Sequence, residues 1–524
     1  MRAGKPRLII FIAMGVAIAE TATARAGSWA GPRRTHADAD RSPEAPGRVL
    51  LTSIPTDALA PATPDSPHSR SPALDALPAG SRICLLDPSR ADHRTVNLTP
   101  DFAAAGRPSL SFTADRLLFV ARESSTGDFQ IWEMSLDGTD SRQITTAPSP
   151  VTARSRATYL STLYSMDQDQ PLDYIAFTGR SRTGHDGRDA IFICRPDGSD
   201  LRQITFSPCP VRDPVLLTDG RLLVGGGPND AGTPTAACGP PALMAVYPDG
   251  TDLFLFTHVR AGHVAAGACE MPSEQVVFVE GRFDARHSGG ALVAVSRLRP
   301  LHSRRQLTGP DEGTYLTPSA VNDSTLLVSY RRFDDPTFGL YLFDVPTATR
   351  TRTVLDVPNE HALDGVVVQP RPRPAGRSSV VRSRESYGSL YGLDAYLSQD
   401  VEAGPKVQIR RINVYGAVDE ETGAATRGRL IGEIPVEPDG SWFAEVPARM
   451  PLRLETVGPD GQTLRRMESW FWVMPREARG CIGCHEDREL TPPNRFPLAL
   501  RKPPARIEFA PAEDEATPKV EAAP

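Results

Sequence analysis

Cys481, Cys484 and His485 form a Cys-x-x-Cys-His sequence near the C-terminus, and their types and spacing suit covalent attachment of a porphyrin. Two thiols three residues apart can form thioethers with the two vinyl groups of one haem. The histidine that follows lies under the ring, where its imidazole can ligate the iron. The sequence therefore predicts one haem c, attached at Cys481 and Cys484, with His485 as the proximal iron ligand.

A Cys-x-x-Cys pair also occurs in zinc sites, redox dithiols and disulfides. A zinc site needs two further ligands, and the chain has neither a second Cys-x-x-Cys nor a His-x-x-x-His pair. A thioredoxin-like dithiol requires a βαβ unit, which the sequence around Cys481 does not show. These observations favour haem attachment and leave a disulfide or a zinc site as the alternatives.

The distal iron ligand must come from earlier in the chain, because no Met or His follows His485. A histidine such as His361 would give a low-potential haem, a methionine would raise the potential, and a vacant position would permit small-ligand chemistry. His361 is the histidine candidate for the distal iron ligand. The methionine candidates are Met450, Met467 and Met474.

Residues 1–26 have the features of a cleaved signal peptide: early basic residues, an apolar run over 8–19, and small residues at Ala24 and Ala26. The apolar run is too short to span a membrane stably. We therefore expect a periplasmic or secreted protein with no membrane span after signal removal. Residues 27–80 and 505–524 are rich in polar residues and Pro, which predicts a disordered linker and a disordered tail.

The net charge of −6 and the scattered arginines give no indication of nucleic-acid binding. Frequent Gly (42) and Pro (50) favour β structure with many turns. Outside the haem motif, Cys84 and Cys194 lie in apolar strand patterns and are expected to be buried thiols. Three cysteines in loop-like sequence are candidates for one disulfide: Cys209, Cys238 and Cys269.

The middle of the chain repeats a unit of two short strands joined by a tight turn. The segment from Ile131 (IWEMSLDGTDSRQIT) closely matches the segment from Ile191 (IFICRPDGSDLRQIT), and Asp-Gly supplies the positive φ that the turn needs. A period of about 50 residues with up to four strands per unit is typical of propeller blades. Six copies predict a mainly β fold with a six-bladed propeller over 81–372. The copies begin at Ile83, Ile131, Ile191, Leu243, Leu292 and Leu340.

This repeat resembles the blades of TolB-type periplasmic propellers in its strand, Asp-Gly turn and Arg-Gln-[Ile/Leu]-Thr form. After a predicted linker at 373–405, alternating strands over 406–475 predict a small β-sandwich, similar to carboxypeptidase-regulatory-like domains. The c-type haem-binding segment, 476–504, follows its last strand.

The end of the chain resembles relatives of the hydrazine synthase alpha subunit, which join a propeller-like domain to a C-terminal c-type haem module. The matching runs are SWFWVMP at 469–475, RGCIGCHEDR at 479–488, PPNR at 492–495 and AL at 499–500. The resemblance implies haem attachment at Cys481 and Cys484 and iron ligation by His485. That subunit carries a second attached haem for its nitrogen chemistry, whereas this chain has a single CxxCH, which argues against hydrazine synthesis.

We therefore expect an exported, c-type cytochrome-like protein that transfers electrons to a redox partner protein, with the propeller as a docking surface. This is an electron-transfer or binding protein rather than a stand-alone enzyme, and no catalytic residues are predicted. One alternative is a periplasmic scaffold whose haem is structural. The other is a haem oxidoreductase subunit related to nitrogen metabolism, with an open iron position.

Overall fold

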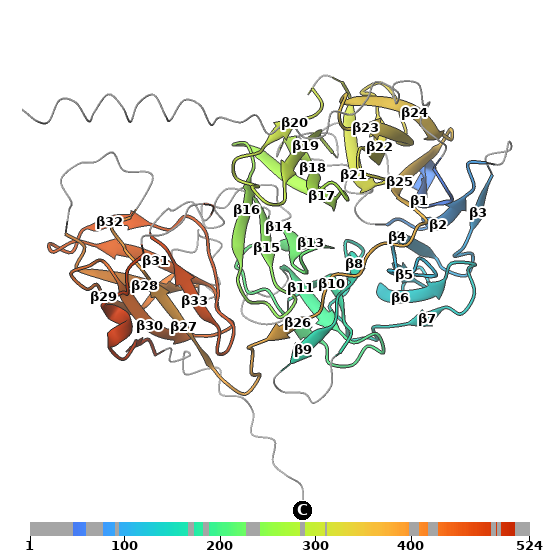
Figure 1. The fold of residues 1–524 in the computed structure, drawn as a ribbon. Coiled ribbons are helices and arrows are strands. Elements are labelled where there is room, and N and C mark those ends of the chain that lie inside the picture. Colours follow the sequence, from blue (N-terminus) through green and yellow to red (C-terminus); the bar gives the residue numbers. More distant parts are fainter. Residues whose placement is uncertain are drawn as a thin grey trace, which may run out of the picture. The chain divides into compact units, whose positions relative to one another are not determined.

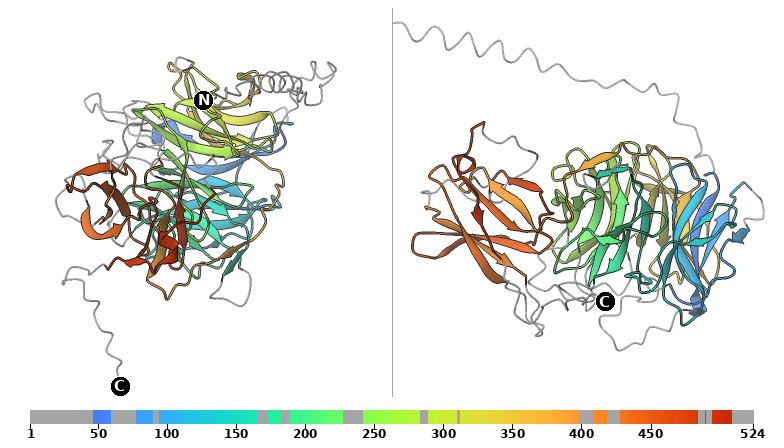
Figure 2. Two further views of the ribbon diagram at one scale, coloured as in Figure 1. Left: turned by 60° about the vertical axis from the view of Figure 1, so that its left-hand side comes forward. Right: turned by 90° about the horizontal axis from the view of Figure 1, so that it is seen from below.

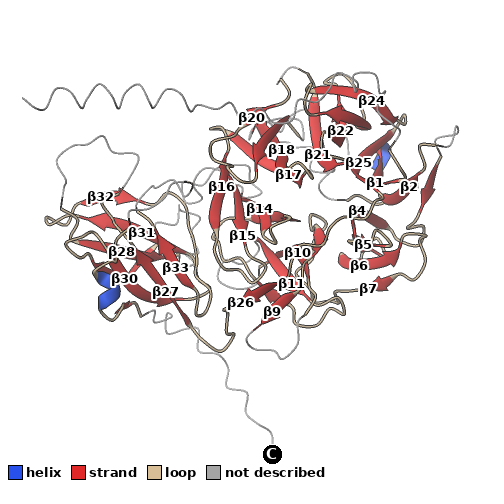
Figure 3. Ribbon diagram, in the orientation of Figure 1, coloured by secondary structure: helices blue, strands red, loops and turns tan. Residues whose placement is uncertain are grey.

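The fold is described from a computed structural model. It describes residues 46–58, 77–89, 94–165, 172–181, 188–226, 242–282, 289–309, 312–397, 408–417, 428–483, 489 and 494–508. Within these ranges the regular structure is almost entirely strand, as predicted, with two 3-10 helices, η1 (Thr56–Ala58) and η2 (Ala499–Arg501) (Figure 3). No helix in the described ranges is long and apolar enough to span a membrane.

Six four-stranded antiparallel sheets follow one another in the described part of residues 46–368, here called the six-sheet region (Figure 1). The first sheet has the order β25 (Glu360–Val367), β1 (Val49–Pro55), β2 (Arg82–Leu86) and β3 (Thr95–Asn97). The second contains β4 (Ala104–Leu110), β5 (Arg116–Arg122), β6 (Gln130–Ser135) and β7 (Arg142–Gln143). The third contains β8 (Ala157–Tyr159), β10 (Ile175–Arg180), β11 (Asp189–Cys194) and β12 (Arg202–Gln203).

The remaining three sheets of this region follow the same order along the chain. The fourth contains β13 (Val211–Leu216), β14 (Leu222–Gly226), β15 (Ala242–Val246) and β16 (Phe254–His258). The fifth contains β17 (His263–Glu270), β18 (Gln275–Arg282), β19 (Ala291–Ser296) and β20 (Arg305–Gln306). The sixth contains β21 (Thr314–Ala320), β22 (Thr325–Arg331), β23 (Gly339–Asp344) and β24 (Thr349–Leu355).

The Asp-Gly turns lie where the repeat predicted them. Gly138 and Gly198 have φ values of 85° and 82°, in the left-handed region that glycine tolerates. The preceding aspartates accept hydrogen bonds from the backbone N–H two residues later, at 2.9 Å for both Asp137 and Asp197. These local bonds fix the hairpins between β6 and β7 and between β11 and β12.

The first strands of neighbouring sheets contact one another in series. β4 contacts β8, and the contacts continue through β13, β17 and β21 to β25, which in turn contacts β4 (Figures 1 and 2). Arg156, beside β8, joins three of these strands by ion pairs with Asp213 of β13 (3.2 Å) and Asp364 of β25 (2.7 Å). Burial raises the pKa of Asp364, but the nearby guanidinium groups of Arg156 and Arg107 outweigh it and hold this pKa below its usual value.

The first sheet is built from both ends of the region. Leu50 of β1 pairs with Val366 of β25, so the end of the region completes the sheet with which the region begins. The prediction of a linker over 27–80 was wrong for β1, which is buried and paired on both sides. This strand is nearly continuous in apolar residues, as expected for a strand covered on both faces, and the polar sequence on either side of it concealed it.

Two further four-stranded sheets form the C-terminal module, residues 387–508. The first has the order β33 (Ala478–Cys481), β27 (Tyr387–Gly392), β30 (Trp442–Pro447) and β34 (Ala505–Arg506). The second has the order β29 (Arg429–Pro435), β28 (Arg411–Gly416), β31 (Leu452–Val457) and β32 (Thr463–Arg466). A separate parallel pair joins β26 (Arg377–Ser379) to β9 (Leu163–Ser165).

These strands change the predicted boundaries. β26 and β27 lie inside the predicted linker 373–405, and β34 lies at the start of the predicted tail, so the module is longer than 406–475. Asp460-Gly461 forms the hairpin turn between β31 and β32. Asp439-Gly440, by contrast, connects β29 to β30, which belong to different sheets. The missed strands pair in parallel with distant partners, which local turn signals do not reveal.

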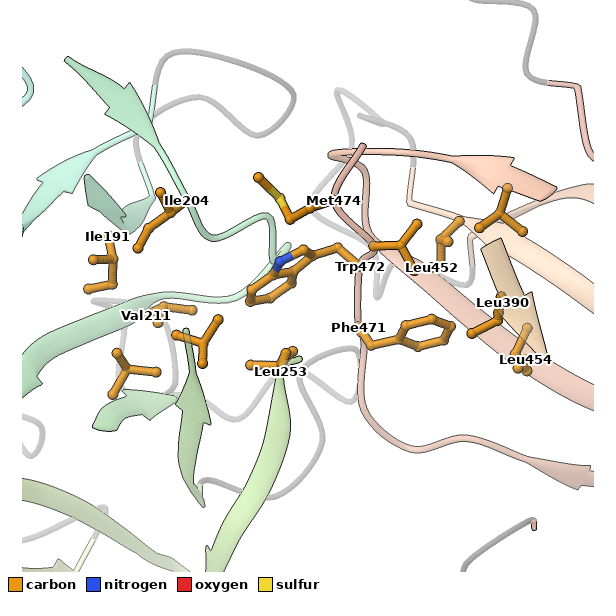
Figure 4. Packing of buried hydrophobic residues seen from close by; sticks show 14 of the residues in the cluster. Ile191, Ile204, Val211, Leu253, Leu390, Leu452, Leu454, Phe471, Trp472 and Met474 are labelled. Atoms are coloured by element: carbon orange, nitrogen blue, oxygen red, sulfur yellow. The ribbon is translucent and has the colours of Figure 1, made fainter. Parts of the chain in front are cut away.

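One buried apolar cluster extends from the third and fourth sheets of the six-sheet region into the C-terminal module (Figure 4). Trp472 lies at the point of contact, is 1% exposed, and donates a hydrogen bond from its indole Nε1 to the carbonyl oxygen of Gly250 at 2.9 Å. Its neighbour Phe471 packs toward Leu452 and Leu454 of the module. The segment immediately before the Cys-x-x-Cys-His motif is therefore rigidly held by both regions.

Candidate functional site

Cys481 is the last residue of β33, an edge strand of the C-terminal module. β33 pairs in parallel with β27, so that Cys481 lies opposite Gly392 and its carbonyl oxygen accepts a hydrogen bond from Leu393 N–H at 2.9 Å. Its side chain is half-buried. Cys484 and His485 lie outside the described residues, so the structure places the first residue of the predicted haem site and not the other two.

The glycines on either side of Cys481 lie against the segment formed by β27 and the residues after it. A Cβ atom at Gly480 would come within 2.8 Å of the Tyr391 ring, and one at Gly483 within 2.4 Å of the Leu397 carbonyl oxygen. Both separations are too short for a side chain. The backbone around Cys481 can approach its neighbours this closely only because these two positions lack side chains.

Arg479 precedes Cys481 by two residues, so the two side chains leave the same face of β33. Its Nη2 donates a hydrogen bond to the Leu253 carbonyl oxygen of the six-sheet region, and its guanidinium carbon lies 5.3 Å from the centre of the Phe471 ring. Its Nη1 is buried without a hydrogen-bond partner among the described residues. A buried cationic donor of this kind suits a carboxylate, because arginine commonly binds carboxylates with two parallel hydrogen bonds.

Glu477 connects the same segment to the six-sheet region. Its carboxylate accepts hydrogen bonds from the backbone N–H groups of Met474 (2.6 Å) and Asp252 (2.8 Å). Burial raises the pKa of Glu477, and the opposing attraction of Arg479 reduces this rise. The pair of Glu477 and Arg479 thus fixes the approach of the chain to Cys481.

Glu489 marks the other end of the motif. Its carboxylate accepts a hydrogen bond from Leu301 N–H at 2.9 Å and forms an ion pair with Arg299 at 3.3 Å, both in the loop between β19 and β20. Its side chain is 11% exposed. The described residues on either side of Cys484 and His485 are thus Gly483, in the C-terminal module, and Glu489, which contacts the six-sheet region.

The distal candidate His361 lies in β25 and is 3% exposed. Its Nδ1 accepts a hydrogen bond from Phe338 N–H at 3.2 Å, and burial, together with the positive charge of Arg331, lowers its pKa to about 4. These surroundings belong to the six-sheet region, whereas Cys481 packs in the cluster shared with the module. The structure does not bring His361 and Cys481 together in the described residues.

The three methionine candidates belong to, or pack against, the apolar cluster that Cys481 contacts, and His361 does not. Met474 is 4% exposed, and Met450 and Met467 pack against the same apolar cluster as Cys481. The Met474 sulfur and methyl lie about 3 Å from where a Cβ of Gly250 would be. Met474 is thereby held in the contact between the two regions.

The remaining cysteines divide between thiols and a disulfide. Cys84 and Cys194 are buried free thiols, as predicted. Cys269, predicted to lie in a loop, is a free thiol in β17, where burial raises its pKa to about 12. Cys209 is disulfide-bonded, and Cys238 lies outside the described residues. Among the residues described, no three His, Cys, Asp or Glu side chains gather as a metal site would require.

Sequence reasoning missed Arg479, Glu477 and Glu489. The alternation of β33 could have placed Arg479 on the face of Cys481, but the strand itself was not predicted. The partners of all three residues lie about 190 to 230 residues earlier in the chain, beyond the reach of local patterns.

Residues 398–486 match the family model of the hydrazine synthase alpha subunit middle domain. The hydrazine synthase subunit alpha of Kuenenia stuttgartiensis is 23% identical over 84% of this chain and 66% of its own length, so the chain spans just under two thirds of that relative.

The solved structure of Kuenenia stuttgartiensis hydrazine synthase has a TM-score of 0.70 at 20% identity and covers 87% of this chain and 71% of that one. TolB from Acinetobacter baumannii has a TM-score of 0.39 at 12% identity, over 61% of this chain and 66% of that chain, which is too distant to support an inference. The family match includes Cys481, and the matched structure shares the succession of sheets. The chain is related to the alpha subunit of hydrazine synthase.

Proposed function

We propose that this chain is an exported c-type haem protein that transfers electrons through one haem. Cys481 and Cys484 would attach the haem and His485 would ligate its iron, as the Cys-x-x-Cys-His spacing requires. The haem would supply a one-electron couple, whose potential depends on the axial ligands and on burial. Residues 1–26 would act as a cleaved signal, which would place the protein in the periplasm or outside the cell.

The observation that carries this proposal is the surroundings of Cys481. A half-buried thiol ends an edge strand, two glycines leave the backbone close to its neighbours, and the buried Nη1 of Arg479 has no hydrogen-bond partner in the described part of the chain. These features fit a haem held at Cys481, with Arg479 binding one of its propionates.

We further infer that the six-sheet region is a six-bladed propeller. The series of contacts from β4 through β25 and back to β4, with one four-stranded sheet at each step, supports this assignment. The N-terminal strands β1 to β3 and the C-terminal strand β25 would share the first blade. The Glu489 contact with Leu301 supports a role for this propeller beside the haem segment, as the docking surface for a redox partner.

The proposal is tested by a reduced pyridine haemochrome spectrum of the protein, exported in cells that carry a c-haem maturation system. We expect a c-type α-band that remains with the protein after denaturation and acid–acetone extraction. Cys481→Ala and Cys484→Ala should each move this band to longer wavelength, because one vinyl group then stays unsaturated, and the double variant should release the haem. A correctly exported protein without covalent haem would overturn the proposal.

A second candidate function is a haem oxidoreductase subunit, favoured by the relation to the hydrazine synthase alpha subunit. The two candidates differ in the sixth iron position. An electron-transfer haem has two protein ligands and does not bind carbon monoxide readily, whereas an open position binds carbon monoxide or nitrite at once. Spectra of the reduced protein under carbon monoxide distinguish them. A third candidate, a scaffold with a structural haem, predicts partner binding that survives the double cysteine substitution.

A further inference from the structure

A cavity of about 440 Å³ lies where the third sheet of the six-sheet region meets the C-terminal module. Its walls come from the β11–β12 turn and β12, from the segment after β26, and from two loops of the module. Two of its residues are arginines, Arg202 and Arg449, and four are apolar side chains that belong to, or pack against, the cluster described above: Ile204, Phe206, Val381 and Met474. Figure 4 shows Ile204 and Met474 facing each other at this contact.

The carboxylates in this cavity are already hydrogen-bonded. Asp249 is 8% exposed and accepts hydrogen bonds from Ser379 Oγ (2.7 Å) and Thr251 Oγ1 (2.7 Å). Asp200 accepts a hydrogen bond from Tyr174 Oη at 2.6 Å and lies 3.9 Å from Arg202, at the limit of an ion pair. The hydroxyl groups therefore take up much of the acceptor capacity of both carboxylates.

Arg449 has no such partner. It forms no ion pair with a described carboxylate, and its two terminal nitrogens reach only the Ser383 carbonyl oxygen, at 3.4 Å each. Hydrogen bonds of this length are weak, so most of its five N–H donors are unused within the described part of the chain. Burial lowers the pKa of Arg449, and the positive charge of Arg202 lowers it further.

The backbone holds Arg449 in this place. Its φ of 62° lies in the left-handed region that non-glycine residues rarely adopt, and its N–H donates a hydrogen bond to Val473 O at 2.9 Å. Val473 is fully buried beside Trp472. The C-terminal module therefore keeps an arginine at the cavity in a backbone conformation that is unfavourable by itself, which is common at binding sites.

We propose that this cavity binds a small organic anion. Arg449 and Arg202 bind its carboxylate groups, and Ile204, Phe206 and Met474 contact its carbon chain. The fork of an arginine matches a carboxylate with two hydrogen bonds, and the apolar walls favour a ligand with carbon atoms over an inorganic ion. The assignment does not require haem attachment, because none of these residues belongs to the Cys-x-x-Cys-His motif, but it does require that Met474 is not the distal iron ligand.

The test is isothermal titration calorimetry of the full chain with succinate, inorganic phosphate and neutral succinamide. We expect saturable binding of succinate, weaker binding of phosphate and no binding of succinamide. Arg449→Gln should weaken succinate binding about tenfold or more, as expected for loss of a charge-assisted hydrogen bond, and Arg202→Gln should also weaken it. Equal binding of succinamide, or equal binding of phosphate, would overturn the assignment.

Arg384→Gln is the matched control, because Arg384 is exposed, lies one residue from Ser383 and does not line the cavity. It removes the same charge and should leave succinate binding within about twofold of the parent protein at 0.15 M salt, where distant surface charges are screened. If Arg384→Gln weakens binding as much as Arg449→Gln does, the attraction is non-specific and the proposal fails. Circular dichroism melting of each variant shows whether it is folded, and Arg449→Lys provides a variant with the charge retained.

Discussion

The six-sheet region and the C-terminal module are both built from four-stranded sheets, but their strands find their partners in different ways. In five sheets of the region, every strand pairs with strands close to it in the chain, and short turns such as Asp137-Gly138 join many of them. In the module, β27 pairs with β33 nearly ninety residues later, and β30 pairs with β34 about sixty residues later, both in parallel. Local turns thus encode the first region, and tertiary packing determines the second.

The difference matters for the candidate site. Cys481 ends a strand that exists only because a distant strand, β27, offers an edge. Arg479, Glu477 and Trp472 all contact the turn and strand around residues 250–253 of the six-sheet region. The position of the haem segment should therefore depend on the contact between the two regions. The formation of the local hairpins should not depend on this contact.

The largest effect is expected at Trp472. Trp472→Ala removes a fully buried indole and should lower the free energy of unfolding by about 3–5 kcal/mol. Because Trp472 joins the two regions, chemical denaturation should change from one transition to two. Trp472→Phe keeps most of the packing and loses only the hydrogen bond to Gly250, which should lower the free energy of unfolding by about 1 kcal/mol.

Trp132→Ala serves as the matched comparison within the six-sheet region. Trp132 is 8% exposed, and its Nε1 has no hydrogen-bond partner among the described residues. This variant should be destabilised but still unfold without separating the regions. A single transition for Trp472→Ala, like that of Trp132→Ala, would show that the module does not depend on this contact.

His361 should make the free energy of unfolding depend on pH, by an amount on the order of 3 kcal/mol. Its pKa is about 4 in the folded protein and about 6.5 when unfolded, so the unfolded state binds the proton more tightly. Stability should therefore fall as the pH drops from 6.5 toward 4, and remain unaffected by His361 above that window. Urea denaturation at several pH values measures it, and His361→Gln, which keeps an acceptor for Phe338 N–H, should flatten the dependence.

Glu477, at the contact between the regions, should give a pH dependence of stability opposite in sign to that of His361. Its pKa is raised in the folded protein, so it contributes stability at pH values below the ordinary glutamate pKa and loses it as the pH rises through the raised value. In a variant that unfolds in two transitions, a fall in pH should lower the free energy of unfolding of the six-sheet region, which contains His361. A rise in pH should weaken the contact made by Glu477. Identical pH profiles for both transitions would contradict this separation.

The smallest effects on stability are expected from substitutions in two turns that share the sequence Asp-Gly-Ser. Asp197-Gly198-Ser199 and Asp439-Gly440-Ser441 make the same hydrogen bond from serine N–H to aspartate, at 2.9 and 3.0 Å. Asp439 also accepts one from Leu498 N–H at 2.9 Å, which fastens η2 to the module. Asp197→Ala should lower the free energy of unfolding by up to about 1 kcal/mol. Asp439→Ala should lower it by about 1–2 kcal/mol more than Asp197→Ala does. Equal thermal shifts for the two variants would contradict the additional role of Asp439.

These contrasts also explain what the sequence could predict. The repeated Asp-Gly turns and Arg-Gln-Ile-Thr segments predicted the succession of sheets, because each hairpin is determined by its own residues. β1 was missed because its partner β25 begins more than 300 residues later. β27 was missed because both of its partners, β30 and β33, lie 50 or more residues later in the chain. At the site, the spacing of Cys481, Cys484 and His485 predicted the chemistry. The donors and acceptors around Cys481 come from residues that only folding brings near.

The pairing of β1 with β25 has a consequence for how the chain reaches its folded state. The last strand of the first sheet becomes available only after residue 367 has been made. β2 can pair with one edge of β1 early, but the other edge of β1 stays unpaired through the synthesis of some 300 residues. An apolar strand with one open edge readily associates with other chains, and pairings between distant segments form slowly. Rapid expression should therefore favour aggregation through residues 49–55, and chaperones that bind extended apolar segments should increase the yield of folded protein.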